Sequence, residues 1–331
     1  METRLADTVE DEGAQLTRGW SNELLKLRDV LRLARIEDWT KNLFVVPPLL
    51  SSGRALDPES QWACLLAFIA FAFVSSGVYC VNDAIDWRED RKHPVKRRRP
   101  IASGALSPSS GYALGAIWIA AGFGVSFFTG GPGVAATLAA YLVLQTFYNL
   151  ILKRIAIVDV VTLSLGFVLR ALAGAVAIGV DPSLWLLLSV FFLCLFLGQI
   201  KRLCDLMSVR KNQDGHEWKA AAGYQSADEL NWMLGVSASL AIVTFVMYSL
   251  SEHAALEVGA EVRGFILLTP LVVIVMFRIY RVALRGLSDS PLHILLTDPI
   301  ILASSVAFGV AAALVLYVPF VGERLRTLFE T

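Results

Sequence analysis

The chain has 331 residues, of which 56% are hydrophobic and only 18% are charged, and its mean hydropathy is +0.59. These values lie outside the ordinary range of soluble domains and leave the soluble-enzyme classes little support. The 29 basic and 29 acidic residues cancel, so net charge points to no partner, and we expect no nucleic acid to bind.

The N-terminal region carries no secretory signal, because its first twenty residues include several acids and lack an apolar core. We expect residues 1–20 to be a disordered cytoplasmic extension. Residues 21–40 place Leu24, Leu27, Leu31 and Ala34 on one helical face with basic residues around the rest. This pattern predicts an interfacial helix that lies on the membrane.

Apolar runs of about the 20 residues needed to cross a bilayer recur along the rest of the chain. We expect nine spans, near residues 42–57, 61–81, 107–128, 132–149, 157–178, 183–200, 232–251, 262–281 and 298–319. Pro47 and Pro48 make the first run short and favour a bend in it. The sequence thus predicts an all-α integral membrane protein: one transmembrane domain over residues 21–331, with nine helices and cytoplasmic loops that cap it.

Orientation follows from the basic residues, which concentrate in the N-terminal segment and in alternate loops, above all the one after the second span. We therefore expect a multi-pass protein of the cell (inner) membrane, with its N-terminus and polar loops in the cytoplasm. The four cysteines lie in or beside apolar runs without paired spacing, so we expect free thiols rather than disulfides or a zinc site.

The stretch 82–100, NDAIDWREDRKHPVKRRRP, crowds acids and bases between two apolar runs. Asp83, Asp86 and Asp90 are three and four residues apart and share one helical face, with Asn82 four residues before Asp86. Oxygen ligands at this spacing suit Mg²⁺ shared with substrate phosphates. The alternative is that these acids are solvated and paired with neighbouring basic residues.

Arg170 lies in the middle of the fifth span, eleven residues after Asp159, so both side chains point the same way. An arginine inside the bilayer suits a phosphate group, and the alternative is an interhelical contact that only fixes packing. After the sixth span, Lys201 and Asp205 share a face beside Arg202. They indicate either a second phosphate or metal contact or ordinary basic flanking of a span. Four more polar residues lie at span ends and are anchors or ligands: Lys41, Asn42, Tyr148 and Lys153.

Residues 82–90, N-D-A-I-D-W-R-E-D, resemble the N-D-x-x-D-x-x-x-D motif of the UbiA superfamily of intramembrane prenyltransferases, and R-R-P-I-A-S-G at 98–104 resembles its continuation. Four stretches are similar to the branch that transfers phosphoribose to decaprenyl phosphate: D-W-T-K-N (38–42), H-P-V-K-R-R-R-P (93–100), Y-N-L-I-L-K (148–153) and D-V-V-T-L-S-L-G-F-V-L-R-A-L-A-G (159–174). The resemblance runs from about residue 30 to 320. Asp205 departs from it where glutamate is expected, and residues 214–224 match loosely.

The resemblance implies a Mg²⁺-dependent glycosyltransferase. It would move 5-phosphoribose from phosphoribosyl diphosphate (PRPP) to a polyprenyl (decaprenyl) phosphate for cell-wall arabinan precursors and release diphosphate. The three aspartates would hold the metal-diphosphate, with Asn82 orienting them, while Asp159 and Asp205 would hold ribose hydroxyls or a second metal. The expected contacts to substrate and its phosphates are Lys41, Asn42, Lys96, Arg99, Tyr148, Lys153, Arg170, Lys201 and Arg202, and Lys201 is also expected to be catalytic.

Two other functions stay open at this point. An ordinary UbiA prenyltransferase would ionise a prenyl diphosphate at the same aspartates and prenylate an aromatic acceptor. A transporter or lipid-scaffolding protein would place charges at mid-bilayer in several spans, whereas here they gather at one face of the membrane, with Arg170 the exception. The expected partners beyond the substrates are membrane lipid and, as an open question, further copies of the chain.

Overall fold

The structure is a computed structural model and describes residues 27–129, 131–211, 224, 227–285 and 291–318. The predicted extension over residues 1–20 lies outside these residues. The described chain is helical and contains no strand. It divides into two compact units, one formed by the chain up to Thr40 together with Ile69–Val125, and one formed by Lys41–Phe68 together with Ser126–Thr331.

Seven helices of the described chain are long and apolar enough to cross a membrane, which confirms an all-helical, multi-pass protein. They correspond to the predicted runs near 61–81, 132–149, 157–178, 183–200, 232–251, 262–281 and 298–319. The run near 107–128 forms a helix of 19 residues, α4 (Pro108–Ser126), which is not among these seven. Nine spans therefore stays a prediction.

The predicted run over residues 42–57 is divided into short helices, in line with the bend expected at Pro47 and Pro48. Its first residues belong to a 3₁₀ helix, η1 (Ile36–Val45), and they are followed by the five-residue α2 (Pro47–Ser51). Two consecutive prolines open α2, where their missing N–H groups cost nothing but also prevent α2 from continuing η1. Gly53, at φ +70°, then turns the chain toward α3.

The first unit contains α3 (Pro58–Asp90) from Ile69 onward, together with α4. At 1.5 Å per residue, the 33 residues of α3 extend about 50 Å, well beyond the ~30 Å hydrocarbon layer. Its last turns, which carry the acidic motif, therefore continue past the apolar part. After α3 follow the short 3₁₀ helix η2 (Lys96–Arg98) and α4.

The expected interfacial helix is present over residues 27–33 of the first unit, and residues 21–26 lie outside the described chain. It ends at Arg35, whose φ of 50° is unfavourable for a helix, so it does not reach residue 40 as predicted. Leu27 and Leu31 are exposed, whereas Leu33 and Ala34 are fully buried. An exposed leucine pair beside arginines agrees with a helix at the membrane surface.

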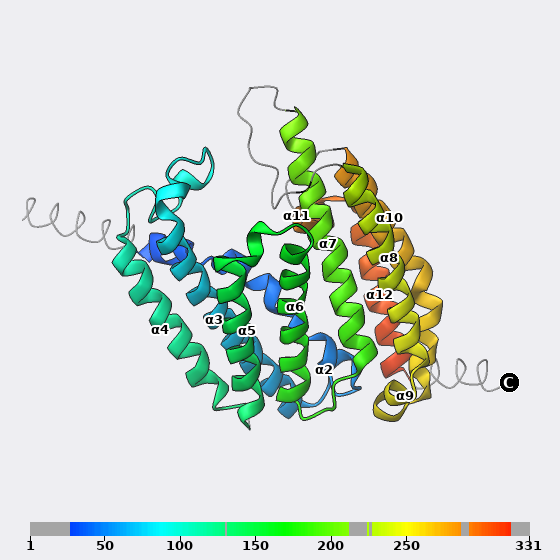
Figure 1. The fold of residues 1–331 in the computed structure, drawn as a ribbon. Coiled ribbons are helices and arrows are strands. Elements are labelled where there is room, and N and C mark those ends of the chain that lie inside the picture. Colours follow the sequence, from blue (N-terminus) through cyan, green and yellow to red (C-terminus); the bar gives the residue numbers. More distant parts are fainter. Residues whose placement is uncertain (1–26, 130, 212–223, 225–226, 286–290, 319–331) are drawn as a thin grey trace, which may run out of the picture. The chain divides into compact units, whose positions relative to one another are not determined.

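The second unit is a bundle whose neighbouring helices follow the chain (Figure 1): α5 packs on α6, α6 on α7, and α7 on α8, while α10 packs on α12. Its elements are α5 (Pro132–Leu150), η3 (Leu152–Arg154), α6 (Val158–Ala177), α7 (Leu184–Lys211), α8 (Ala227–Leu250), α9 (Glu252–Val258), η5 (Ala260–Leu268), α10 (Thr269–Leu284), α11 (Pro291–Thr297) and α12 (Pro299–Tyr317).

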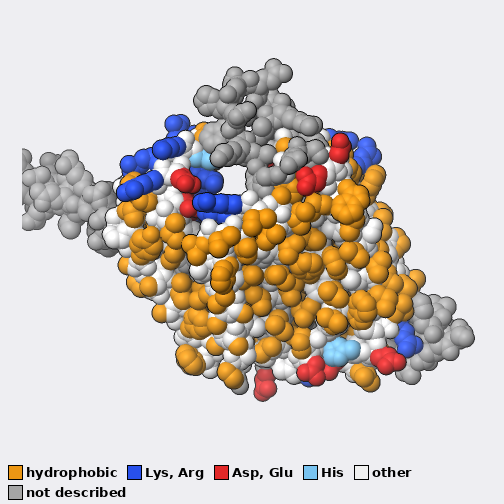
Figure 2. All heavy atoms as spheres, in the orientation of Figure 1, with side chains coloured by type: hydrophobic (Ala, Val, Ile, Leu, Met, Phe, Trp, Pro, Cys, Tyr) orange, Lys and Arg blue, Asp and Glu red, His pale blue; other side chains and the backbone are white. Residues whose placement is uncertain are grey.

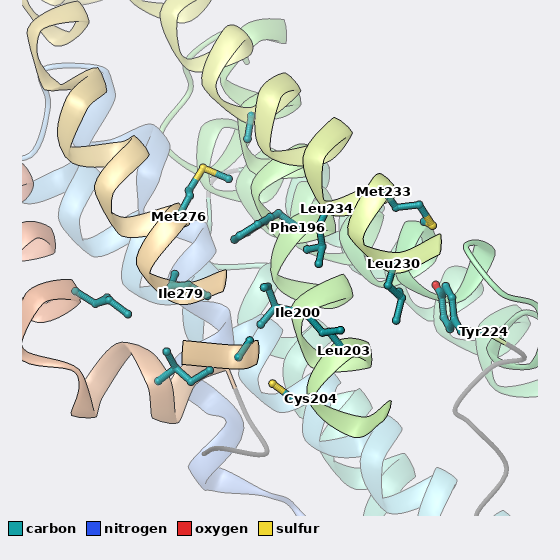
Figure 3. Close-up of a cluster of buried hydrophobic side chains, with 14 residues drawn as sticks. Phe196, Ile200, Leu203, Cys204, Tyr224, Leu230, Met233, Leu234, Met276 and Ile279 are labelled. Atoms are coloured by element: carbon teal, nitrogen blue, oxygen red, sulfur yellow. The ribbon is translucent and has the colours of Figure 1, made fainter. Parts of the chain in front are cut away.

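The main core of the second unit lies where α7, α8 and α10 meet (Figure 3). Phe196, Ile200 and Leu203 of α7 pack with Leu230 of α8 and Ile279 of α10. By contrast, many leucines and valines of α8 and α12 are exposed, and Figure 2 shows apolar side chains over most of the visible surface, with charged ones at its margins. Such an exposed apolar surface is expected of helices that face lipid.

Candidate active site

In the first unit, the last turns of α3 bring two of the three predicted metal ligands onto one arginine. Nη1 of Arg99 donates to Oδ2 of Asp90 at 2.6 Å and to Oδ1 of Asp83 at 3.1 Å. Nη2 of Arg35 donates to the same Oδ1 of Asp83 at 2.6 Å. The side chains of Asp83 and Asp90 are only 3% and 5% exposed. Both carboxylates thus lie in a nearly dry position and are paired with guanidinium groups.

The loop that carries Arg99 has its own internal supports. Nε of Arg91 donates to the carbonyl of Ala102 at 3.1 Å. Nδ1 of His93 accepts hydrogen bonds from the backbone N–H groups of Val95 and Lys96 at 3.2 and 3.3 Å. Burial, followed by the charge of Lys96, lowers the pKa of His93, so the imidazole stays neutral at pH 7 and can accept these bonds. His93 therefore shapes the turn that presents Arg99.

The residues present fit a Mg²⁺ ion. Within the described chain, no group of three or more His, Cys, Asp or Glu side chains is close enough to hold an ion. Mg²⁺, however, commonly uses only one or two protein carboxylates and takes its other ligands from water and substrate phosphates. Asp83 and Asp90 offer such a pair of converging oxygens, and the Arg99 guanidinium stands between them as a cation. Asp86, on the same helix face, is half-buried, and its place among the ligands stays a prediction.

In the second unit, Asp159 is fully buried at the start of α6 and accepts two hydrogen bonds. Nε of Arg202 on α7 donates to its Oδ2 at 2.7 Å, and the hydroxyl of Tyr224 donates to its Oδ1 at 2.9 Å. The Tyr224 oxygen in turn accepts from the N–H of Ile157, a residue with φ +71°. Burial raises the pKa of Tyr224 well above its usual range, which keeps the phenol protonated as the donor.

This second cluster includes Asp205 more loosely, since Nη1 of Arg202 lies 3.4 Å from its Oδ2 and the carboxylate is 36% exposed. The structure thus brings together Asp159, Arg202 and Asp205, three residues predicted from separate parts of the sequence. The Tyr224 hydroxyl also holds the backbone N–H of Ile157, which has a positive φ, directly before α6 begins.

Arg170 is 4% exposed and its guanidinium contacts protein groups on three sides. Nε donates to Oδ1 of Asn42 at 2.8 Å, Nη1 to the carbonyl of Gly166 at 2.8 Å, and Nη2 to the Tyr141 hydroxyl at 3.1 Å. The guanidinium carbon also lies 4.7 Å from the centre of the Tyr141 ring. These contacts link η1, α5 and α6, which agrees with the packing alternative for this arginine.

The other predicted site residues lie nearer the surface. Those with exposed side chains are Lys41, Lys96 and Lys201. Those that are half-buried are Asn82, Asp86, Tyr148 and Lys153.

Three residues that contact the predicted site residues were not predicted from the sequence. They are Arg35, which contacts Asp83, Tyr141, which contacts Arg170, and Tyr224, which contacts Asp159. Arg35 was placed on the polar face of the interfacial helix, where its pairing across 48 residues has no local signal. Tyr141 did carry a signal, since it is a polar group within an uncharged span and lies four residues before Gln145 on the same helix face. Tyr224 lies 65 residues from Asp159 and in the stretch that matched loosely.

Comparison with known proteins places the chain in a family. The model of the UbiA prenyltransferase family matches residues 44–292, so the chain belongs to the UbiA prenyltransferase family. The earlier resemblance of the acidic motif to this superfamily is confirmed.

Two curated relatives and one solved structure illustrate the likeness. A decaprenyl-phosphate phosphoribosyltransferase of Corynebacterium glutamicum is 31% identical over 68% of this chain and 69% of its own length. The nodulation protein NoeC of Azorhizobium caulinodans is 36% identical over 64% of this chain and 68% of its own. A UbiA homologue from Archaeoglobus fulgidus, bound to DMAPP and Mg²⁺, superposes with a TM-score of 0.63 at 17% identity, covering 88% of this chain and 99% of its own. That structure supports the fold alone.

Proposed function

We propose that this member of the UbiA prenyltransferase family transfers 5-phosphoribose from PRPP to a polyprenyl phosphate, decaprenyl phosphate in the first instance, and releases diphosphate. The observation that carries the proposal is the likeness to the C. glutamicum decaprenyl-phosphate phosphoribosyltransferase, at 31% identity over two thirds of both chains. Its product would serve as a precursor for cell-wall arabinan.

The proposed transfer requires groups that bind the phosphate and diphosphate anions and does not require a general base. The acceptor phosphate is already an anion at neutral pH, so no proton has to be removed from the nucleophile. The developing charge is on the departing diphosphate, and fixed cations that neutralise it lower the barrier. Bound Mg²⁺ would supply Lewis-acid stabilisation of that leaving group. The first unit offers the matching residues: the carboxylates of Asp83, Asp86 and Asp90 for the ion, and Lys96 and Arg99 for phosphate oxygens.

The second unit carries further residues that were predicted to bind substrate. Exposed or half-buried cations are the candidates for the 5-phosphate and the acceptor phosphate, namely Lys41, Lys153 and Lys201. Asp159, Arg202 and Arg170 are already engaged by protein groups, and for them we propose a positioning role. Asp205, which is partly exposed, stays the candidate for a ribose hydroxyl or a second metal contact.

We further propose that the protein lies in the cell (inner) membrane with this chemistry on the cytoplasmic side. The cation-rich loop between α3 and α4 supports that orientation, since basic loops are retained in the cytoplasm. PRPP is highly charged and water-soluble, so a cytoplasmic opening also places the donor where it can bind.

The deciding experiment supplies purified protein in detergent with PRPP labelled in the ribose, Mg²⁺ and decaprenyl phosphate. We expect label to enter the organic phase as a polyprenyl phosphoribosyl lipid. Asp83→Asn should lower this turnover about 100-fold or more, because the Mg²⁺ ion that would stabilise the leaving diphosphate loses one of its carboxylate ligands. Arg97→Gln, an exposed residue of the same loop, is the matched control and should stay close to the unchanged enzyme.

A second candidate is transfer of a prenyl group from a prenyl diphosphate to an aromatic acceptor. The observation that favours it is the fold shared with a UbiA homologue whose structure was determined with DMAPP and Mg²⁺. A parallel reaction with a prenyl diphosphate and an aromatic acid separates the two functions. Prenylated acid without labelled lipid would replace the phosphoribosyl proposal by this one.

A further inference from the structure

The acidic end of α3 has one feature that the proposed reaction does not use. Two guanidinium groups hold the oxygens that a Mg²⁺ ion would need. Nη1 of Arg99 lies within 3.1 Å of both Asp83 and Asp90, and Nη2 of Arg35 lies 2.6 Å from the same oxygen of Asp83. A Mg²⁺ ion therefore competes with both arginines for one oxygen of Asp83.

The two sides of these ion pairs differ in their freedom to move. Asp83 and Asp90 are short side chains on a 33-residue helix and are 3% and 5% exposed. Arg99 directly follows the three-residue η2, and its side chain is 28% exposed. Arg35 follows the interfacial helix over residues 27–33, and its side chain is 22% exposed. Long arginine side chains can change rotamer at the surface, whereas buried carboxylates on a helix cannot. The arginines are therefore the partners that can leave.

A diphosphate offers the arginines a new partner when they leave. Guanidinium groups bind phosphate oxygens with two parallel N–H···O bonds, a stronger arrangement than the single contacts found here. A bare Mg²⁺ ion offers no such compensation: it would displace two cations from buried carboxylates and leave them without an anion. The charges at this site thus favour joint arrival of metal and diphosphate over arrival of the metal alone.

We infer that Arg35 and Arg99 are exchangeable counter-cations that make Mg²⁺ binding conditional on the diphosphate donor. In the resting protein they pair with Asp83 and Asp90 and orient both carboxylates. When the donor binds, they yield those oxygens to the ion and turn to the diphosphate. The inference rests on the proposed function only in taking a metal-diphosphate as the ligand, and it holds equally for a prenyl diphosphate.

Thermodynamic linkage between Mg²⁺ binding and diphosphate binding predicts the direction in which each affinity should change. The arginines weaken binding of Mg²⁺ alone and strengthen binding of Mg²⁺ in the presence of diphosphate, so the two ligands bind cooperatively. A merely structural ion pair would not reverse its effect between the two conditions. Neutralising Arg99 should therefore raise the affinity for Mg²⁺ alone and lower the affinity for Mg²⁺ in the presence of diphosphate.

The test measures Mg²⁺ binding to the purified protein in detergent by isothermal titration calorimetry, first with Mg²⁺ alone and then with saturating inorganic pyrophosphate. Arg99→Gln should tighten binding of Mg²⁺ alone by roughly threefold to tenfold. With pyrophosphate present it should weaken Mg²⁺ binding by about tenfold. Arg35→Gln should shift both affinities in the same directions, and Arg99→Lys should restore part of the difference.

Arg97→Gln removes one exposed positive charge from the same loop and controls for the general effect of charge. Two results would overturn the inference. One is that Arg99→Gln changes the two Mg²⁺ affinities no more than this control does. The other is that Arg99→Gln weakens Mg²⁺ binding both with and without pyrophosphate. If Arg99→Gln does not fold, Arg35→Gln and Arg99→Lys carry the same comparison. Because neither titration contains a ribosyl donor or a lipid, its outcome is independent of the labelled-lipid assay.

Discussion

At the residue scale, the second unit depends on how buried charges are satisfied. Asp159 is fully buried, and its charge is matched by Arg202 and by the Tyr224 hydroxyl. Arg170 is likewise satisfied by Asn42, Tyr141 and a backbone carbonyl. A buried ion that loses one partner pays the desolvation cost of the group left behind, so these contacts matter more than surface pairs do.

Tyr224→Phe tests how much a buried hydrogen bond to Asp159 contributes to stability, because it removes only the hydroxyl oxygen. The change leaves the ring in the core but removes the donor to Asp159 and the acceptor for the Ile157 N–H. We expect a loss of about 1–3 kcal/mol of stability, seen as a lower midpoint of thermal unfolding in detergent.

Tyr280→Phe is the matched control for that substitution. The Tyr280 hydroxyl donates to the neutral side chain of Asn231 at 3.2 Å in a partly buried position. Its removal should cost no more than about 1 kcal/mol. Equal losses in the two variants would contradict the importance assigned to Tyr224.

At the element scale, α3 and α4 approach closely because glycines face the partner helix. A Cβ at Gly122 of α4 would lie 2.7 Å from the carbonyl oxygen of Ala70 and 2.6 Å from a methyl group of Val74. Gly77 and Gly115 show the same crowding across this interface. Small residues let membrane helices pack by van der Waals contact and backbone proximity, where lipid leaves no hydrophobic driving force.

Gly122→Ala should therefore push α3 and α4 apart and destabilise the first unit by about 1–3 kcal/mol. Gly124→Ala lies two residues further along the same helix, where a Cβ would meet nothing within 4 Å, so it should be neutral or slightly stabilising. Thermal unfolding of the two variants side by side decides the matter. A Gly122→Ala protein as stable as Gly124→Ala would mean that the interface can relax.

At the scale of the whole molecule, the question is how often the chain crosses the membrane. The five helices α4 to α8 lie between the loop at Lys96 and α9, and α4 is the one that is not among the seven candidate spans. If α4 crosses, Lys96 and Glu257 lie on opposite sides of the membrane. If it does not, they lie on the same side.

Cysteine labelling distinguishes the two topologies. The four native cysteines are buried, so Lys96→Cys and Glu257→Cys add reactive thiols at exposed positions against a low background. With a membrane-impermeant maleimide, we expect Lys96→Cys to react only in inside-out vesicles and Glu257→Cys only in right-side-out vesicles. Reaction of both in the same vesicle type would exclude α4 as a span. Permeabilised vesicles, in which both must react, serve as the control.

Much of the architecture was predictable from the sequence because lipid imposes one strong rule on a spanning segment: it must be apolar and satisfy its own backbone. That rule located α5, α6, α7, α8, α10 and α12, and the break at Pro47 and Pro48 signalled that the first run was unusual. α4 is not among the seven candidate spans, and two of its glycines, Gly115 and Gly122, pack closely against α3.

The fold class, the family motif and the position of the acidic turns at the end of α3 could be predicted from the sequence, since each depends on local composition and helical spacing. The partners of the buried charged residues could not, because they follow from how the helices pack: Arg99 and Arg35 contact Asp83, Arg202 and Tyr224 contact Asp159, and Asn42 and Tyr141 contact Arg170. These pairs join residues far apart in the chain, and the cost of burying a charge selects them only after the helices have packed. In the folded protein, two of the three predicted metal ligands, Asp83 and Asp90, are therefore already paired with arginine side chains.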